Sequence, residues 1–293
     1  MKLKQHVFVI CILFGVFSVS GASAAKPEKT LRVMTFNIKY NEPRDGENAW
    51  EFRKQKVADV IRFHKADIVG VQEALIGQLR DLEALLPGFA WCGVGRTDGK
   101  NEGEFSAILY RKGRFKLLET NTFWLSTDPL KAGSKSWDAA FPRIVTWAKF
   151  RDNISKKTFF QFNTHFDHVG AKAREESAKL ILAKIESLAG TGSSFVLTGD
   201  FNVEENSVPY AILTGKTAEK YPLVLKDARY DSRNGHFGGN STFSGFKDLI
   251  PNRKIDYVFV KRGTAVFEHG VLSDIWDGKW ASDHLPVLAE ISF

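Results

Sequence analysis

Carboxylate, amide and imidazole side chains flank two apolar runs in the second half of the chain. Gly199-Asp200-Phe201-Asn202 follows the apolar residues 195–197, and Ser282-Asp283-His284 precedes an apolar run that begins at Leu285. Short β-branched and aromatic runs bounded by polar residues predict strands, so these groups should stand where strands end or begin. Together they offer oxygen ligands for a hard metal ion and an imidazole for acid–base chemistry. The pattern therefore indicates metal-assisted hydrolysis of a phosphoester.

Four further runs with strand-like composition end in, or contain, residues of the same kinds. They cover residues 32–36, 66–71, 158–162 and 254–260. The first three are followed by Asn37, by Glu73 and by His165, and the fourth contains Asp256. A carboxylate within an apolar strand is costly to bury unless it is paired. Residue types suited to catalysis thus recur along the chain, each on or just after a predicted strand.

Six short segments occur in an order that resembles a known superfamily. They are Thr35-Phe36-Asn37, Val71-Gln72-Glu73, Asn163-Thr164-His165, Gly199-Asp200-Phe201-Asn202, Ile255-Asp256-Tyr257 and Ser282-Asp283-His284. This series resembles the endonuclease/exonuclease/phosphatase superfamily, which includes deoxyribonuclease I, nocturnin-type deadenylases, sphingomyelinases and inositol polyphosphate 5-phosphatases. Each segment alone is a weak signal, but six in the right order are a strong one. Within the superfamily, residues 122–126, 136–140 and 143–147 resemble an exported bacterial branch.

The resemblance implies a deoxyribonuclease I-like fold, a four-layer α/β sandwich in which two mixed β-sheets pack face to face with helices outside. Apolar residues spaced three and four apart predict helices over residues 48–64, 75–86 and 171–189. Two stretches, 126–142 and 229–253, are rich in glycine or proline and predict long loops. Long loops inside a compact domain are usually functional.

The metal site is expected around Glu73. From its position alone, this carboxylate could equally cap the helix that follows it. The resemblance makes Glu73 the principal Mg2+ ligand and places Asn37 and Asp283 on or beside the same ion. A magnesium site needs only one or two carboxylates, because water and substrate phosphate complete the octahedron. We therefore expect Mg2+ as the cofactor, with Mn2+ as an alternative.

Asp200 and Asn202 are two residues apart, and if the chain stays extended there, both side chains point to the same side. The sequence Gly-Asp-x-Asn also favours a turn, and taken alone the turn is the better interpretation. The resemblance assigns Asp200 to activation of the attacking water and Asn202 to contact with the phosphate.

Two acid–histidine pairs follow from the resemblance. It pairs Asp256 with His284 and Glu104 with His165, and it places both pairs beside one phosphate. Taken singly, each histidine would more often be structural, and Glu102 lies close enough in sequence to compete with Glu104. We expect each acid to lie within hydrogen-bond reach of its imidazole, at about 2.6–3.2 Å.

Three residues are candidates for substrate binding besides Asn202. Arg143 opens a predicted strand, where it could hold a phosphate bidentately or form a structural ion pair. Trp124 and Trp137 could stack on a base or sugar, or simply pack the loop onto the sheets.

The leading hypothesis is a phosphodiesterase or nuclease, because two dyads and Asn202 would surround a single phosphate. The alternative is a phosphomonoesterase or sphingomyelinase-like enzyme acting on a phosphorylated sugar, inositol or lipid headgroup. A non-catalytic binding module is a third and weaker hypothesis. A broad nuclease should show a basic groove, whereas an enzyme for small substrates should show a pocket formed by the two long loops.

The N-terminus predicts an exported protein. Lys2 and Lys4 precede the apolar residues 7–19, and Ala22-Ser23-Ala24 fits a signal-peptidase site. We expect cleavage near Ala24-Ala25, one domain over residues 26–293, a periplasmic or secreted monomer, and no stable membrane insertion. Cys92 would then be the only cysteine, which excludes an intramolecular disulfide. The net charge would fall from +7 to +5, which suits a phosphate-bearing substrate but equally serves solubility.

Overall fold

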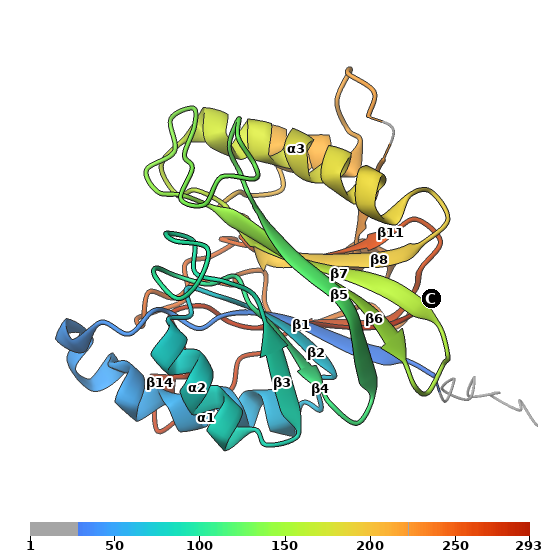
Figure 1. The fold of residues 1–293 in the computed structure, drawn as a ribbon. Coiled ribbons are helices and arrows are strands. Elements are labelled where there is room, and N and C mark those ends of the chain that lie inside the picture. Colours follow the sequence, from blue (N-terminus) through green and yellow to red (C-terminus); the bar gives the residue numbers. More distant parts are fainter. Residues whose placement is uncertain (1–28, 222) are drawn as a thin grey trace, which may run out of the picture.

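Two mixed β-sheets lie face to face between two layers of helices in the computed structural model (Figure 1). The structure describes residues 29–221 and 223–293, so the predicted signal segment lies outside the described residues. The seven-stranded sheet has the order β10 (His236–Phe237), β12 (Ala265–Val271), β15 (Val287–Ser292), β1 (Leu31–Asn37), β2 (Ile68–Gln72), β4 (Ile108–Arg111) and β3 (Phe89–Cys92). The six-stranded sheet has the order β5 (Phe115–Trp124), β6 (Ile144–Asp152), β7 (Thr158–His165), β8 (Ser194–Asp200), β11 (Asp256–Lys261) and β9 (Leu225–Asp227).

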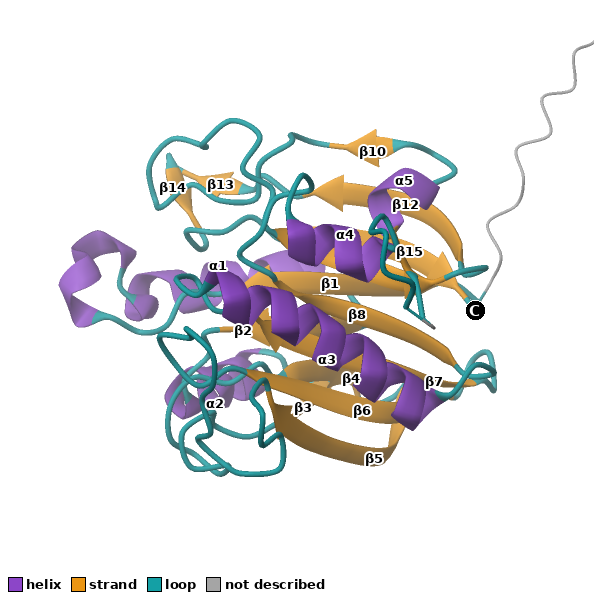
Figure 2. Ribbon diagram, turned by 90° about the horizontal axis from the view of Figure 1, so that it is seen from above, coloured by secondary structure: helices purple, strands orange, loops and turns teal. Residues whose placement is uncertain are grey.

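Helices cover the outer face of each sheet (Figures 1 and 2). The helices α1 (Trp50–Phe63) and α2 (Ile76–Leu85) pack on the seven-stranded sheet, and α3 (Ala171–Ala189) and α4 (Val208–Thr214) pack on the six-stranded sheet. Smaller elements are η1 (Pro43–Asn48), α5 (Ala228–Asp231), β13 (Ile275–Trp276) and β14 (Lys279–Trp280). Three separate clusters of buried apolar side chains fill the three interfaces between layers. The predicted four-layer sandwich is therefore confirmed.

Strand alternation decides which side chains reach the space between the sheets. In β8, Phe195 and Leu197 pack against the helices, whereas Val196 faces the other sheet. Because successive side chains of a strand point to opposite faces, Asp200 falls on the same side as Val196. By the same alternation, Asn37 points to the same face of β1 as Val33, and Asp256 points to the same face of β11 as Val258. The polar residues at the strand ends thus converge at one edge of the inter-sheet space.

The helix predictions are confirmed to within two residues, and α3 has the predicted bounds. Residues 126–142 contain no regular element, as expected. The stretch 229–253 is not wholly irregular, because it includes most of α5 and the short strand β10. The Asp227 side chain caps α5 at the Arg229 amide, and β10 pairs in parallel with β12. Across the described ranges, no helix is long and apolar enough to cross a membrane.

Candidate active site

Strand register brings three of the predicted catalytic residues together. Asp200 lies opposite Asp256 in the antiparallel pair β8–β11, and opposite His165 in the parallel pair β7–β8. His284 comes from the segment before β15 in the other sheet and reaches across the gap. The site is therefore assembled from both sheets at the edge where β1, β2, β7 and β8 end.

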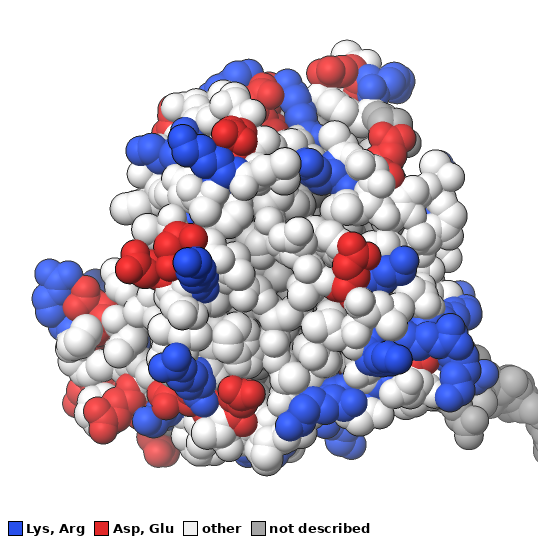
Figure 3. Space-filling view, in the orientation of Figure 1, with Lys and Arg blue, Asp and Glu red and all other residues white. Residues whose placement is uncertain are grey.

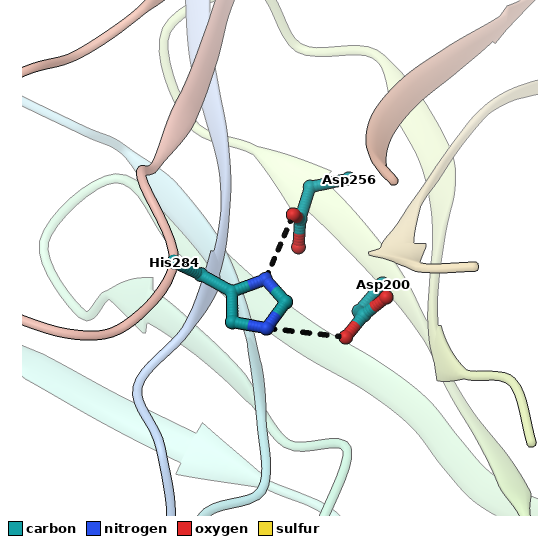
Figure 4. A group of neighbouring side chains, drawn as sticks. All are labelled: Asp200, Asp256 and His284. Atoms are coloured by element: carbon teal, nitrogen blue, oxygen red, sulfur yellow. Dashed lines mark hydrogen bonds and ion pairs between the residues drawn. The ribbon is translucent and has the colours of Figure 1, made fainter. Parts of the chain in front are cut away.

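His284 lies between two carboxylates (Figure 4). Its Nδ1 atom is 2.9 Å from Oδ2 of Asp256, and its Nε2 atom is 3.7 Å from Oδ2 of Asp200. All three side chains are buried. The distance expected for Asp256 and His284 is met, and the Asp200 carboxylate forms a third member of the series.

Burial and neighbouring charge move the pKa values of His284 and Asp200. Burial alone would lower the pKa of His284, but the Asp256 and Asp200 carboxylates outweigh it and raise the pKa to about 10. Burial, together with the charge of Asp256, raises the pKa of Asp200 to about 7. At neutral pH the imidazole is therefore protonated, while Asp200 is near its midpoint.

The predicted loop over residues 229–253 holds the dyad in place. The Thr242 hydroxyl accepts hydrogen bonds from the amides of Ile255 and Asp256, at 3.0 and 3.2 Å. The Phe243 ring packs edge-on against His284, with centroids 5.0 Å apart. These contacts fix both members of the dyad from one side, a role that sequence reasoning did not assign to any residue of the loop.

Asn37 connects the dyad to Glu73. Its Nδ2 atom donates to Oε1 of Glu73 at 3.1 Å and to Oδ2 of Asp200 at 3.0 Å. Its Oδ1 atom accepts from the Lys39 amide, which fixes the orientation of the side-chain amide. Asn37 therefore presents its nitrogen to the carboxylates and positions both of them. Its expected place on or beside the metal ion stays a prediction.

Glu73 and Asp283 offer carboxylate oxygens, which suit a hard cation better than an amide nitrogen does. Burial and the charge of Glu73 raise the pKa of Asp283 against the opposing effect of His284. Burial also acts on Glu73, but Lys39 and His284 outweigh it and lower the pKa of Glu73. The Lys39 ammonium lies 3.9 Å from Oε2 of Glu73, and the two oxygens of Glu73 also accept hydrogen bonds from Asn37 and from the Tyr40 amide. Two mutually repelling carboxylates are a suitable donor set for Mg2+. Asp200, Asp256 and His284 are also close enough together to hold an ion, but their mutual contacts already pair them.

Asn202 reaches the site through a turn. Its φ of 50° is left-handed, and the Asp200 carboxylate accepts a hydrogen bond from its amide at 2.9 Å. The turn that residues 199–202 favour on their own is therefore confirmed, and Asp200 closes it. The turn still brings Nδ2 of Asn202 to 3.1 Å from Nε2 of His165, so the two residues lie together.

Glu104 and His165 do not form the expected hydrogen bond. Oε2 of Glu104 lies 4.0 Å from Nδ1 of His165, and that nitrogen has no hydrogen-bond partner among the described residues. Glu104 instead pairs with Arg96 at 2.7 Å. Burial and the guanidiniums of Arg143 and Arg96 hold the pKa of His165 well below its usual range. Glu104 thus forms an ion pair with Arg96 instead of a dyad with His165, and the imidazole of His165 beside this pair is neutral.

The other expected substrate-binding residues differ in exposure. Arg143 is buried; its Nε is 3.4 Å from the Asp167 carboxylate and its Nη2 donates to Nδ1 of His168 at 3.0 Å. The structural ion pair is thus present, while Nη1 of Arg143 has no partner among the described residues, and a phosphate contact stays a prediction. Trp124 is only 5% exposed and donates to the Arg96 carbonyl, so it packs the loop and cannot stack on a substrate. Trp137 is 37% exposed and remains available for stacking.

A polar network behind the site joins the two sheets and was missed by sequence reasoning. Asn163 donates to the carbonyls of Val71 and Ala107, both at 2.9 Å, and its Oδ1 accepts from Gln72 at 2.7 Å and from Thr198 at 3.0 Å. Asn163 is part of a recognised segment, but the partners could not be read from the sequence because they come from other strands.

The family is decided by the extent of the sequence match. Residues 34–284 match the sequence model of the Endonuclease/Exonuclease/phosphatase family. The chain belongs to this family. It is thus a member of a family of phosphoester hydrolases, and the family's segments are those that the structure gathers at one edge of the sandwich.

Solved structures of family members share the fold over nearly the whole domain. An endonuclease/exonuclease/phosphatase from Bacteroides vulgatus is 40% identical, with a TM-score of 0.85 over 90% of this chain and 99% of that one. A mannosyl-6-phosphatase from Bacteroides thetaiotaomicron is 36% identical, with a TM-score of 0.84 over 90% of this chain and all of that one. The catalytic domain of human nocturnin, 20% identical, has a TM-score of 0.70 over 90% of this chain and 93% of that one, and it shares the fold alone.

Proposed function

We propose that this family member is an exported, magnesium-dependent hydrolase that removes phosphate from a phosphorylated sugar or a related small polar molecule. The observation that carries the chemistry is the buried series Asp256–His284–Asp200, in which a protonated imidazole lies beside a carboxylate whose pKa is about 7. Groups whose surroundings push their pKa values apart are suited to acid and base roles. Asp200 would take the proton of the attacking water, and His284 would give one to the leaving oxygen.

Glu73 and Asp283 are the residues that would hold the metal ion. When bound, Mg2+ supplies a Lewis acid that neutralises and polarises the phosphate. Mn2+ prefers similar oxygen ligands and is the alternative cofactor. Asn37 keeps Glu73 and Asp200 in place through its amide nitrogen, and Asn202 lies 3.1 Å from Nε2 of His165, where it would contact the phosphate.

The substrate assignment rests on similarity and on surface charge. The 36% identity with a mannosyl-6-phosphatase supports a sugar phosphate. The face drawn in Figure 3 carries basic and acidic side chains interspersed over most of its area, and its basic side chains gather at the lower right rather than in a band across the face. The direct Glu104–His165 hydrogen bond, one reason to expect a diester substrate, is absent. Nucleic-acid cleavage is the second candidate, because the half-exposed Trp137 could stack on a base.

Export is proposed from the sequence of residues 1–25, with a positive start, an apolar run and a small-residue cleavage pattern. A mature N-terminus near Ala25 in protein recovered from the native host would support it. An intact Met1 would contradict export, and a lipid on Cys11, which lies in the apolar run, would contradict cleavage near Ala25.

A substrate panel tests the proposal. Purified protein with Mg2+ should release inorganic phosphate from hexose 6-phosphates faster than it cleaves DNA or RNA. Activity on nucleic acid without any on phosphomonoesters would contradict the proposal and favour the second candidate. Failure to hydrolyse every phosphoester in the presence of Mg2+ or Mn2+ would favour a binding module.

A further inference from the structure

A groove of about 500 Å³ shares one residue, Asn202, with the candidate active site. Its walls come from the start of α3, from the segment that follows Asn202, and from Arg253 and Ile255. The helix α3 starts at the sheet edge where β7 and β8 end (Figure 1). A substrate whose phosphate lies next to Asn202 could therefore extend into this groove.

Two guanidiniums line the groove without a carboxylate partner among the described residues. The Arg174 side chain donates only to the Asp167 carbonyl, at 2.9 Å. The Arg253 side chain makes no hydrogen bond to a described residue, and its guanidinium lies 5.7 Å from the centroid of the Phe243 ring. Phe243 in turn packs against His284, so Arg253 is connected to the catalytic dyad through one aromatic ring.

The other charges of the groove do not cancel these two. Lys172 and Glu175 also line it, but they are 3.4 Å apart and thus pair with each other. Glu175 is further neutralised by Lys179 at 3.0 Å. Glu204 is the remaining carboxylate of the lining, and it is exposed to solvent. Guanidiniums present a planar fork of donors that fits phosphate oxygens.

We infer that Arg174 and Arg253 form a second phosphate subsite, so that the preferred substrate carries another phosphate group besides the one that is hydrolysed. The inference rests on the proposed phosphoester hydrolysis and narrows its substrate class. The second phosphate could belong to a small bisphosphorylated sugar or to the neighbouring linkage of an oligonucleotide. The shared chemistry is a phosphate held by two guanidiniums beside Asn202.

The test compares kcat/KM for substrates with one and two phosphates. The probes are glucose 6-phosphate, glucose 1,6-bisphosphate, thymidine 5′-phosphate and the 5′-phosphorylated dinucleotide pTpT. The variants are Arg253→Gln, Arg174→Gln and the double variant. Arg262→Gln is the matched control, because Arg262 is exposed at the end of β11 opposite Asp256.

We expect each groove variant to lower kcat/KM about tenfold or more for a doubly phosphorylated probe, as for loss of a charge-assisted contact. Glucose 6-phosphate and thymidine 5′-phosphate should change by less than about threefold, since a single phosphate is held by other residues. A selective loss with glucose 1,6-bisphosphate would identify a sugar bisphosphate, and a selective loss with pTpT would identify an oligonucleotide.

Equal effects on singly and doubly phosphorylated probes, or no effect on either, would overturn the subsite and leave the proposed hydrolysis standing. Hydrolysis of none of the probes would contradict the proposed function itself. Arg253→Gln is the safer variant for folding, because that side chain makes no hydrogen bond to a described residue. As a second measurement, calorimetry in EDTA should show weaker binding of glucose 1,6-bisphosphate to Arg253→Gln than to the parent or to Arg262→Gln.

Discussion

The Nδ1 atom of His284 lies 2.9 Å from Oδ2 of Asp256, although the two residues come from different sheets. The Asp256 strand is in the six-stranded sheet, and His284 precedes a strand of the seven-stranded sheet. A buried carboxylate needs such a partner. The contact therefore ties the two halves of the sandwich together where the chemistry is proposed to occur.

Glu73→Gln should abolish metal-dependent activity while the protein remains folded. The substitution removes one negative charge from the proposed ion site and leaves one acceptor oxygen, which can serve either Asn37 or the Tyr40 amide. We expect calorimetry to show much weaker Mg2+ binding, and we expect the Mg2+-dependent hydrolytic activity to fall by orders of magnitude. The parent should lose activity in EDTA and regain it with added Mg2+. Full activity of the parent in excess chelator would exclude the metal site.

Glu104→Gln should have a much smaller effect than Asp256→Asn. Glu104 is paired with Arg96 and does not touch His165 directly. Because the two side chains share no hydrogen bond, the kinetic losses of Glu104→Gln and His165→Ala should come close to adding in the double variant, with the small coupling expected of groups 4.0 Å apart. If the double variant loses no more activity than His165→Ala alone, Glu104 and His165 act as a dyad after all.

Gly70→Ala should destabilise the protein by about 1–3 kcal/mol, as expected for overpacking a buried site. A Cβ at residue 70 would lie 2.3 Å from both Oδ1 of Asn163 and Oγ1 of Thr198, inside the polar network behind the site. Denaturant unfolding measures the change. Gly77→Ala is the control with the opposite sign, because residue 77 lies in α2 with open space around it and alanine favours helix. Equal stability of the two variants would argue against the tight packing.

Asp200→Asn should stabilise the metal-free protein at pH 8. The pKa of Asp200 is raised to about 7 in the folded state, whereas it is near 3.9 in an unfolded chain. The folded state therefore binds this proton more tightly, and stability falls as the pH rises from about 4 to about 7. Asparagine cannot ionise, so the gain in stability of the variant over the parent should be largest above pH 7 and should vanish near pH 4. Melting temperatures in EDTA across this range provide the test, with about 2–4 °C expected per kcal/mol. A difference in melting temperature between variant and parent that stays the same at all pH values would contradict the raised pKa of Asp200.

The sequence predicted the parts of the site that depend on strand ends. Asn37, Asp200, Asp256 and His165 follow from period-two alternation and from the order of the family segments. The turn at Asn202 was favoured by the turn-forming residues around it. Partners from distant segments could not be predicted, because the sequence does not show that Glu104 pairs with Arg96 or that the Trp124 indole donates to the Arg96 carbonyl. The groove beside Asn202 was also not predicted, since Arg174 and Arg253 line the same groove only in the folded chain.

A double-mutant cycle on Asp256 and His284 tests the central claim most directly. If the carboxylate acts by holding the imidazole in its charged, oriented form, then Asp256→Asn and His284→Ala should each lower kcat by about 10²–10⁴-fold. The double variant should lose little more than the worse single variant, because residues acting as a unit are not additive. Circular dichroism and melting curves must show that all three variants fold. Losses that simply multiply in the double variant would contradict the account and leave His284 as a separate contact to the phosphate.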